Sequence, residues 1–473
     1  MALAATTLSP VAASAQQARS ISMSERAQGD KVNPQLVAEY GGRYDGPQAA
    51  FVERVGKQVA VQSGLANAGD DFTVQLLNSS IENAFAIPGG YVYVTRQLLA
   101  LMNNEDELAF VMGHEVGHVA ARHSAGRRQT SAIGGLLAGI VGAVAGKSDF
   151  GQLLGAGAQQ ASKLYTLKFG RDQEYQADTL GVRYVIGAGY DPWGAPEVLA
   201  QLDASSKLQA RTAGRQANAT PTWLSTHPSN AKRVARARAL AQQTQRDSPA
   251  RAPQDAAFLR MLDGMRYDDD PAKGVIDGQT FRQPTLRIRF TAPQGYSISN
   301  TDDAVTVSGA RGQAQLRMAA GISRLDAAVV EGFRKLGGQL SANQVRQTTI
   351  NDRKAAVASL TATANRQRLD ATVLAIQFPG AMYVWTMVTP PGDGAATFTP
   401  MIAGFTTMTA AEAGQVGGKH IRIHSVRQGE TIDSLSKRMA YPDFQRERFV
   451  MLNGIDPNLE LRPGMLVKLV ERD

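Results

Sequence analysis

Five consecutive residues, 114–118, form the pattern in this chain that is most able to do chemistry. They follow the order His-Glu-x-x-His, with His114, Glu115 and His118. Positions i and i+4 of a helix share a face, so both imidazoles can bind one zinc ion. Glu115 lies beside them and can act as the general base that takes a proton from a zinc-activated water. The spacing therefore predicts a zinc-dependent hydrolase.

A catalytic zinc ion also needs a third protein ligand. Ala121 and Ser124 stand where the metzincin pattern requires Gly and His, which excludes that class. Glu174 and Asp178 lie four residues apart in a second predicted helix. Glu174 can bind the metal while Asp178 orients a ligating histidine. An ordinary polar helix with acidic residues near its start explains the composition equally well, so the residues alone leave both interpretations open.

Three further residues have candidate roles. His227 precedes Pro228 and is interpreted either as a catalytic residue that stabilises the oxyanion or as a fourth zinc ligand that silences the enzyme. A capping or packing histidine is the plain alternative. His123 is expected on a different face of its helix from the zinc pair, as a structural residue. Arg233 can orient the site, but solvent exposure is the favoured interpretation.

The surrounding patterns predict the elements that position these side chains. Apolar residues recur at helical spacing over residues 105–123, which predicts one long helix. Alternation over residues 72–77 and 91–95 predicts strands, and Pro88-Gly89-Gly90 is a turn signal between them.

Three separated motifs support a family resemblance. Residues 83–90 (NAFAIPGG), the His-Glu-x-x-His pattern and Glu174-x-x-x-Asp178 occur in this order. Together they resemble the gluzincin peptidases of family M48, which include the HtpX- and BepA-like enzymes, over about residues 35–240. The chain is most similar to the soluble, exported branch of that family. The resemblance implies a mainly α zincin-type domain with a small β-sheet.

The same resemblance assigns roles to single residues. It implies that His114, His118 and Glu174 bind one Zn²⁺ per chain, that Glu115 is the catalytic acid and base, and that Asp178 supports a ligand. It further implies protein or peptide substrates.

The upstream motif is expected to line the cleft. By the same resemblance, Asn83, Ala84 and Phe85 bind substrate, because this stretch forms a strand edge that pairs with an extended peptide.

The last fifty residues carry a second set of marks. Gly429-Glu430-Thr431, Leu452-Asn453-Gly454 and Pro463-Gly464 occur within a strand-helix-helix-strand pattern. This pattern resembles the LysM family. The resemblance implies binding of peptidoglycan or other N-acetylglucosamine glycans, in a groove between residues 429–432 and 453–456.

The fold class expected is therefore multidomain. Residues 1–30 are signal-like or disordered, and residues 31–245 form the zinc metallopeptidase domain. Residues 257–415 are an α+β domain in which we find no chemistry, and residues 420–473 are the βααβ LysM module. The apolar segment 132–146 is expected to be a buried hairpin, with a lid or a membrane-contacting loop as alternatives.

Composition bounds the partners and the compartment. The chain of 473 residues has no cysteine, so a metal must be held by His, Asp or Glu. Residues 207–251 account for the whole net charge of +8, which indicates a solvated helix face or a patch for an anionic envelope surface. No motif indicates nucleic-acid binding. Residues 2–15 end in an Ala-x-Ala pattern, so we expect a truncated export signal and a periplasmic location, with a disordered tail as the alternative.

These observations predict a zinc-dependent metalloendopeptidase of the bacterial cell envelope that acts in periplasmic protein quality control. Two other functions stay open. One is a self-inhibited, chaperone-like scaffold bound to peptidoglycan. The other is a hydrolase of peptidoglycan crosslinks.

Overall fold

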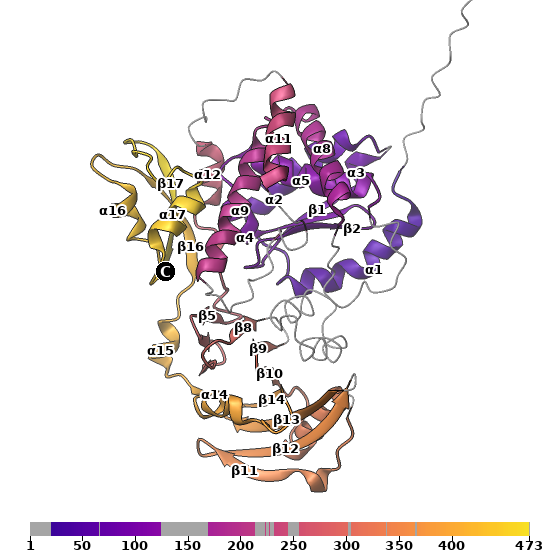
Figure 1. Ribbon diagram of the computed structural model, residues 1–473, viewed down its shortest axis with the longest axis vertical. Coiled ribbons are helices and arrows are strands. Elements are labelled where there is room, and N and C mark those ends of the chain that lie inside the picture. The colour runs from indigo at the N-terminus through magenta and orange to yellow at the C-terminus, as the bar shows by residue number, and fades with distance from the viewer. Residues whose placement is uncertain are drawn as a thin grey trace, which may run out of the picture.

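The computed structural model describes residues 20–65, 67–123, 169–212, 223, 227, 231–244, 255–300, 304–336, 338–364 and 367–472 (Figure 1). The N-terminal residues 1–19 and the apolar segment 132–146, for which the sequence offers expectations, lie outside these ranges. Within them, no helix combines the length and the apolar character that crossing a membrane requires.

The first domain contains a small three-stranded sheet. Its strands are β1 (Thr73–Leu77), β2 (Ala84–Ile87) and β3 (Tyr91–Thr95), in the order β1-β3-β2. Strand β3 is parallel to β1 and antiparallel to β2. The two strands expected from alternation are present as β1 and β3, and β2 occupies one edge of the sheet while β1 occupies the other.

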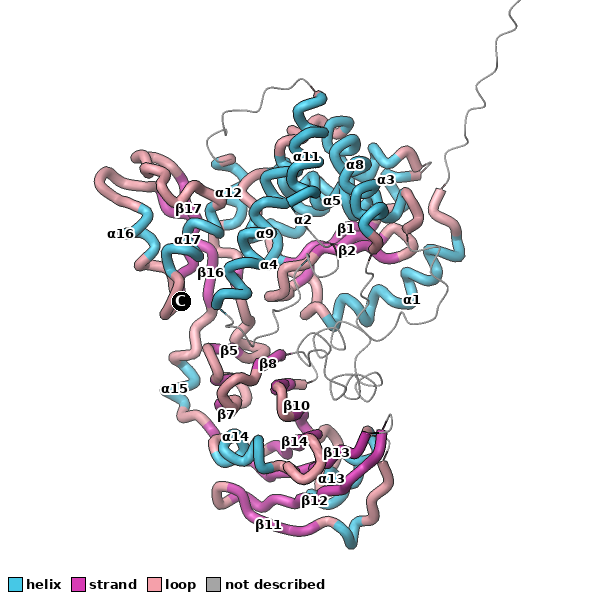
Figure 2. Tube along the Cα trace, in the orientation of Figure 1, coloured by secondary structure: helices cyan, strands magenta, loops and turns pink. Residues whose placement is uncertain are grey.

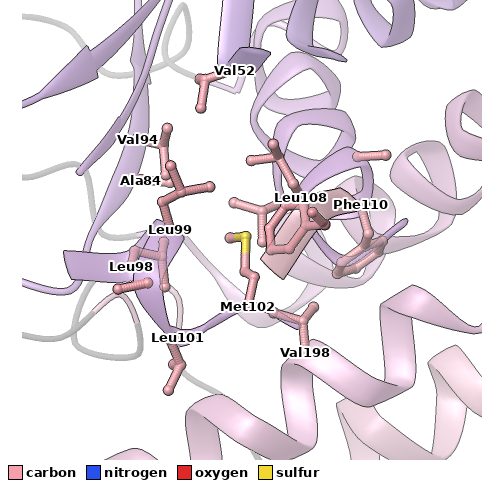
Figure 3. Close-up of a cluster of buried hydrophobic side chains, with 14 of the residues drawn as sticks. Val52, Ala84, Val94, Leu98, Leu99, Leu101, Met102, Leu108, Phe110 and Val198 are labelled. Carbon is pink, nitrogen blue, oxygen red and sulfur yellow. The ribbon is translucent and has the colours of Figure 1, made fainter. Parts of the chain in front are cut away.

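Helices cover both faces of this sheet (Figures 1 and 2). Helix α1 (Met23–Glu39) packs on one face, where Leu36 and Tyr40 join a cluster with Phe85 and Tyr93. The other face carries the main core, in which side chains of the sheet meet those of several helices (Figure 3). The helices of this domain are α2 (Pro47–Ala60), η1 (Val61–Ser63), α3 (Ala68–Asp71), α4 (Arg96–Leu101), α5 (Glu105–Ala120), α8 (Arg171–Gly187), α9 (Gly194–Thr212) and α11 (Ala231–Gln243).

Helix α5 is shorter at its end than the sequence pattern indicates. It begins after the N-cap Asn104 and ends at Ala120, three residues before the expected end. Arg122 has a φ of 55°, a left-handed conformation that a helix does not continue. The backbone N–H of His123 then bonds the carbonyl of His118 at 3.1 Å, so the chain folds back on the last turn.

The middle part of the chain is built on a seven-stranded sheet. Its order is β11-β12-β13-β14-β10-β9-β8, and every neighbouring pair is antiparallel. In β13, Val373 and Ala375 face a cluster with helix α13, whereas Leu374 and Ile376 face a cluster with the four-stranded sheet β15-β7-β6-β5. The elements are β5 (Val275–Asp277), β6 (Thr280–Gln283), β7 (Ile288–Thr291), β8 (Ser297–Asn300), β9 (Val305–Gly309), β10 (Gly312–Met318), α13 (Leu325–Lys335), η2 (Ala342–Gln344), β11 (Arg346–Ile350), β12 (Arg353–Ala364), β13 (Gln367–Phe378), β14 (Ala381–Thr389), η3 (Ala396–Phe398), α14 (Thr399–Ala403), β15 (Thr406–Thr407) and α15 (Ala410–Gly414).

The C-terminal part has the strand-helix-helix-strand order that the sequence indicates. Its elements are β16 (Lys419–Ser425), α16 (Ile432–Ser436), α17 (Gln445–Asn453) and β17 (Leu466–Arg472). Its apolar side chains belong to the same buried cluster as the core of the first domain. In Figure 1 these elements lie beside α9, and α17 contacts that helix.

Residues 256–267 depart from the domain boundary that the sequence indicates. Helix α12 (Ala256–Leu262) contributes Phe258 and Leu262 to the core of the first domain, and β4 (Arg266–Tyr267) pairs with β16. They pack with the first and last parts of the chain rather than with the middle one, because their apolar side chains complete the shared core.

Candidate metal centre

Two helices cross closely at the proposed site. A Cβ atom on Gly113 of α5 would lie 3.0 Å from the carbonyl oxygen of Gly181 on α8, a distance that real Cβ atoms rarely show. The missing side chains therefore let the two backbones approach. This approach brings Glu174 and Asp178 of α8 opposite His114 of α5, and all three are buried.

Four side chains converge on one point. Single ligand atoms of His114, His118, Glu174 and His227 all lie within 4.8 Å of one another. The Nε2 atoms of His114 and His118 are 3.0 Å apart, and His227 Nδ1 lies 3.2 Å from His114 Nε2. Oε1 of Glu174 is 3.1 Å from His227 Nδ1 and 3.6 Å from His118 Nε2.

These distances fit a zinc ion. Ligand atoms about 2.0–2.1 Å from a tetrahedral zinc lie roughly 3.3 Å from one another.

The charge of the site is a second test of whether it fits a metal ion. The buried carboxylates of Glu115, Glu174 and Asp178 face one buried guanidinium, that of Arg233. A divalent cation balances this negative surplus, and isolated buried charges are costly. The donor set of three imidazoles and one carboxylate is also one that zinc prefers.

Asp178 and Arg233 support the cluster from behind. Asp178 Oδ1 lies 3.0 Å from His114 Nδ1, so it orients the imidazole whose Nε2 faces the metal position. Arg233 donates to both oxygens of Asp178, at 2.8 and 2.6 Å. It also donates to the His227 carbonyl and pairs with Glu174, at 3.1 and 3.0 Å. The expectation that Arg233 faces solvent is therefore wrong, because this network holds it buried.

His118 has a partner of its own. Its Nδ1 lies 2.8 Å from Nδ1 of His123, whose Nε2 lies 3.1 Å from the Gln176 amide oxygen. Phe169 stacks on the His118 ring with centroids 3.7 Å apart. The turn after α5 thus brings His123 back to the zinc pair, which the helical face analysis missed because the helix ends before His123.

The charges shift the protonation of the cluster. Burial lowers the pKa of His114, but hydrogen bonds with Asp178 and Glu174 outweigh burial and raise it to about 9. Burial, followed by the neighbouring His114 and His227, holds the pKa of His118 well below its ordinary value. Burial would raise the pKa of Asp178, yet its bonds to Arg233 and His114 keep it below its usual range. The carboxylate is therefore charged and able to compensate a cation.

Glu115 has one engaged oxygen and one without a partner. The indole N–H of Trp223 donates to Glu115 Oε1 at 3.0 Å, and His227 Nε2 lies 3.4 Å from the same oxygen. Among the described residues, no group bonds Oε2. Sequence reasoning did not single out Trp223. Its position four residues before His227 places it on the same side of a helical turn, which is the only signal it offered.

The three residues expected to bind substrate divide between two faces of the sheet. Asn83 donates its amide to Tyr40 Oη at 3.0 Å, and Phe85 stacks between Tyr40 and Tyr93 under α1. Ala84 belongs to the core on the face that carries α5. The side chains of Asn83 and Phe85 thus point away from the metal centre, and only the backbone of this edge strand stays available for pairing.

His227 joins the cluster with its Nδ1 atom, which lies 3.2 Å from His114 Nε2. Of the two functional roles left open by the sequence, the arrangement fits a metal-ligand position, since this nitrogen is among the four donor atoms.

Comparison with known proteins identifies this region. Residues 47–241 match the model of Peptidase family M48. The β-barrel assembly-enhancing protease of Yersinia pestis is 29% identical over 285 residues, which cover 58% of this chain and 55% of that protein. The protein of the same name from Escherichia coli (strain K12) is 32% identical over 178 residues, covering 36% of this chain and 34% of that protein.

A mitochondrial protein is also similar to this chain. The mitochondrial metalloendopeptidase OMA1 of Schizosaccharomyces pombe is 31% identical over 208 residues, which cover 42% of this chain and 56% of that protein. The chain thus spans between about a third and just over a half of the length of these three relatives. The part of the chain that holds the buried cluster, residues 47–241, is therefore similar to the metallopeptidases of family M48.

Proposed function

We propose that the chain is a zinc-dependent endopeptidase of the periplasm that cleaves protein substrates of the cell envelope. The observation that carries the proposal is the buried cluster of His114, His118 and Glu174 with the unpartnered Oε2 of Glu115 beside it. A bound zinc ion supplies Lewis acidity toward water and the scissile carbonyl. Glu115 takes the proton of the attacking water and delivers it to the leaving amine nitrogen.

The edge strand β2 is the proposed binding site for the substrate backbone. It has a neighbour on one side only among the described strands, so its outer backbone groups can pair with an extended peptide. A pocket at the end of β2 supports this placement. It is lined by Ala86, Ile87, His118, Arg122 and Phe169, among others, and so joins the strand to the metal centre.

We also propose that the arrangement described is a closed form of the site. A catalytic zinc keeps one position open for water or substrate, whereas four protein ligands close it. His227 supplies the fourth donor atom and is 1% exposed. His227 must therefore leave the metal before a peptide can bind, and its role is inhibition rather than oxyanion stabilisation.

The test of the peptidase proposal compares wild type with Glu115→Gln. Both full-length proteins are loaded with zinc, and their metal content and casein cleavage are measured. We expect equal zinc content and a loss of activity of about a hundredfold or more in the variant, since proton transfer is removed. Glu53→Gln is the matched control, because Glu53 is half exposed on α2 and pairs only with Lys57 among the described residues.

The outcomes separate the alternatives. If Glu115→Gln cleaves casein as well as wild type does, the assigned chemistry is wrong. If Glu115→Gln no longer cleaves casein but still restores the phenotype of cells that lack the protein, the scaffold function is supported. Release of soluble fragments from purified peptidoglycan by wild type would instead favour the crosslink hydrolase.

A glycan-binding role for residues 420–473 is a second proposal. Its support is the strand-helix-helix-strand order and the exposure of Gly429, Thr431 and Asp456 in the two expected groove segments, 429–432 and 453–456. Ile432 and Asn453 of these segments are buried, so their side chains do not line a groove. The full chain is expected to sediment with insoluble peptidoglycan and to be released by N-acetylglucosamine oligomers. Failure to sediment would contradict this proposal and leave the peptidase proposal intact.

A further inference from the structure

Trp223 is the residue of this site whose role the zinc chemistry does not explain. It is fully buried and is not among the metal-ligand atoms. Its indole N–H nevertheless points at the one side chain that must move protons, with Nε1 lying 3.0 Å from Glu115 Oε1. Buried tryptophan usually satisfies its N–H, and a carboxylate is a strong acceptor for it.

The tryptophan is held in place from several sides. Its backbone N–H bonds the carbonyl of Glu82 at 2.6 Å, two residues before the edge strand β2 begins. The guanidinium of Arg233 lies 5.1 Å from its ring centroid, and the ring of His114 meets it edge-on with centroids 5.1 Å apart. The His227 ring also stacks on the indole with centroids 4.8 Å apart, and the His227 backbone N–H bonds the Trp223 carbonyl at 2.8 Å. The other three contacts do not involve His227 and remain if its ring leaves the metal position.

The bond acts on only one oxygen of Glu115. Oε1 is occupied by the indole N–H, whereas Oε2 has no bonding partner among the described residues. Glu115 follows His114 directly on α5. The helix fixes the position of its backbone, but the orientation of its carboxylate has to be set by a contact of the side chain. A general base has to lie within hydrogen-bond reach of the proton it takes.

We infer that Trp223 is a positioning residue for the peptidase reaction: its indole N–H fixes Glu115 through Oε1 and leaves Oε2 as the oxygen that accepts the proton. This inference rests on the proposed peptidase function and adds a residue to it. Trp223 acts through Glu115 and supplies none of the four metal-ligand atoms.

The contact itself is tested without any activity measurement. The chain has three tryptophans, so indole ¹⁵N labelling of the zinc-loaded full chain gives three resolvable N–H signals. Trp223→Phe assigns its own signal by removing it. We expect the Trp223 signal to move in Glu115→Gln, while the Trp385 signal, whose N–H has no bonding partner among the described residues, stays in place. A Trp223 signal that ignores Glu115→Gln overturns the inference.

Kinetics then separate positioning from structural support. Trp223→Phe keeps an aromatic ring and loses the N–H, and we expect kcat to fall roughly ten- to hundredfold with KM, zinc content and Tm near those of wild type. Trp385→Phe is the matched control, because Trp385 is equally buried but lies in the core of the middle part. It measures the general cost of this replacement.

A double variant completes the test. In a Glu115→Asp background, where the carboxylate no longer reaches the same place, Trp223→Phe should have little further effect on kcat. An unchanged or raised kcat in Trp223→Phe contradicts the inference, as does a loss that adds fully to that of Glu115→Asp. If neither wild type nor His227→Ala cleaves any substrate, the peptidase proposal fails, whereas the indole signal still decides whether Trp223 holds Glu115.

Discussion

Asp178 carries two contacts whose strength depends on its charge. It orients His114 at 3.0 Å and receives two hydrogen bonds from Arg233. Asp178→Asn keeps the size of the side chain but cannot accept on both sides, so we expect zinc affinity to fall about 10- to 100-fold. Competition with a chromogenic chelator measures this affinity.

Asp172→Asn is the control for this change. Asp172 lies on the same helix as Asp178 but is exposed at its start. Equal zinc affinity in Asp178→Asn and Asp172→Asn would show that Asp178 does not support the ligand.

At the scale of single residues, the sequence predicted the parts of the site with fixed local spacing. His114, Glu115 and His118 follow one helical repeat, and the structure brings His114 and His118 together with Glu174. Arg233 was misjudged, because a helix with several basic residues does not show which one points inward. Its burial with Ala237 and Ala241, at intervals of four, is a weak signal that could have identified the buried face.

The crossing of α5 and α8 governs the site at the scale of elements. A Cβ atom on Gly181 would lie 3.0 Å from the backbone nitrogen of His114, so Gly181→Ala must push the two helices apart. We expect a loss of roughly 1–3 kcal/mol in the free energy of unfolding, together with weaker zinc binding. Denaturant unfolding and the chelator assay measure the two effects.

Gly69→Ala provides the comparison for this glycine. A Cβ at Gly69 has no heavy atom within 4 Å among the atoms considered for such a contact, and Gly69 lies in the short helix α3. If Gly181→Ala is as stable and binds zinc as well as Gly69→Ala, close helix packing does not build the site.

Elements were predictable where their periodicity is local. Strand β3 and the start of α5 agree with the sequence patterns, because alternation and helical spacing are properties of neighbouring residues. The end of α5 could not be predicted, because it depends on the left-handed conformation of Arg122, a residue that is not a glycine. That turn also decides the position of His123.

Lys468 links the C-terminal part of the chain to the first domain. It is fully buried on β17, and its Nζ donates to the carbonyls of Ala100, Leu101 and Met102 at 2.8, 3.0 and 2.7 Å. These carbonyls end helix α4, where backbone acceptors lack partners within the helix and favour a cation. The C-terminal part therefore closes the core of the first domain.

The prediction at this scale concerns the cooperativity of unfolding. Lys468→Met removes the ammonium donor from the α4 carbonyls, although Leu101 keeps a bond from the Gln201 amide at 2.9 Å, and we expect a loss of about 2–3 kcal/mol in the free energy of unfolding. Metal release and the loss of C-terminal structure should follow one transition. Lys437→Met, at an exposed lysine of the same region, should unfold like wild type. Separate transitions in wild type would contradict a shared core.

The shared core could not be predicted from the sequence. Hydrophobic patterns show which face of an element is buried but not which distant element covers it. The motifs of residues 420–473 suggested a self-contained module, whereas Ile421, Phe449 and Leu469 pack into one cluster with residues of the first domain. Long-range burial of this kind is a property of the whole chain.

The most direct test of the account is the coordination of zinc in the full-length protein. Metal analysis and X-ray absorption spectroscopy on wild type are expected to show about one zinc per chain, bound by three imidazoles and a carboxylate at about 2.0–2.2 Å. His227→Ala should keep the zinc, lose one imidazole from its coordination and cleave casein faster. A wild-type chain that binds no zinc, or a coordination shell that His227→Ala leaves unchanged, would contradict the metal centre described above.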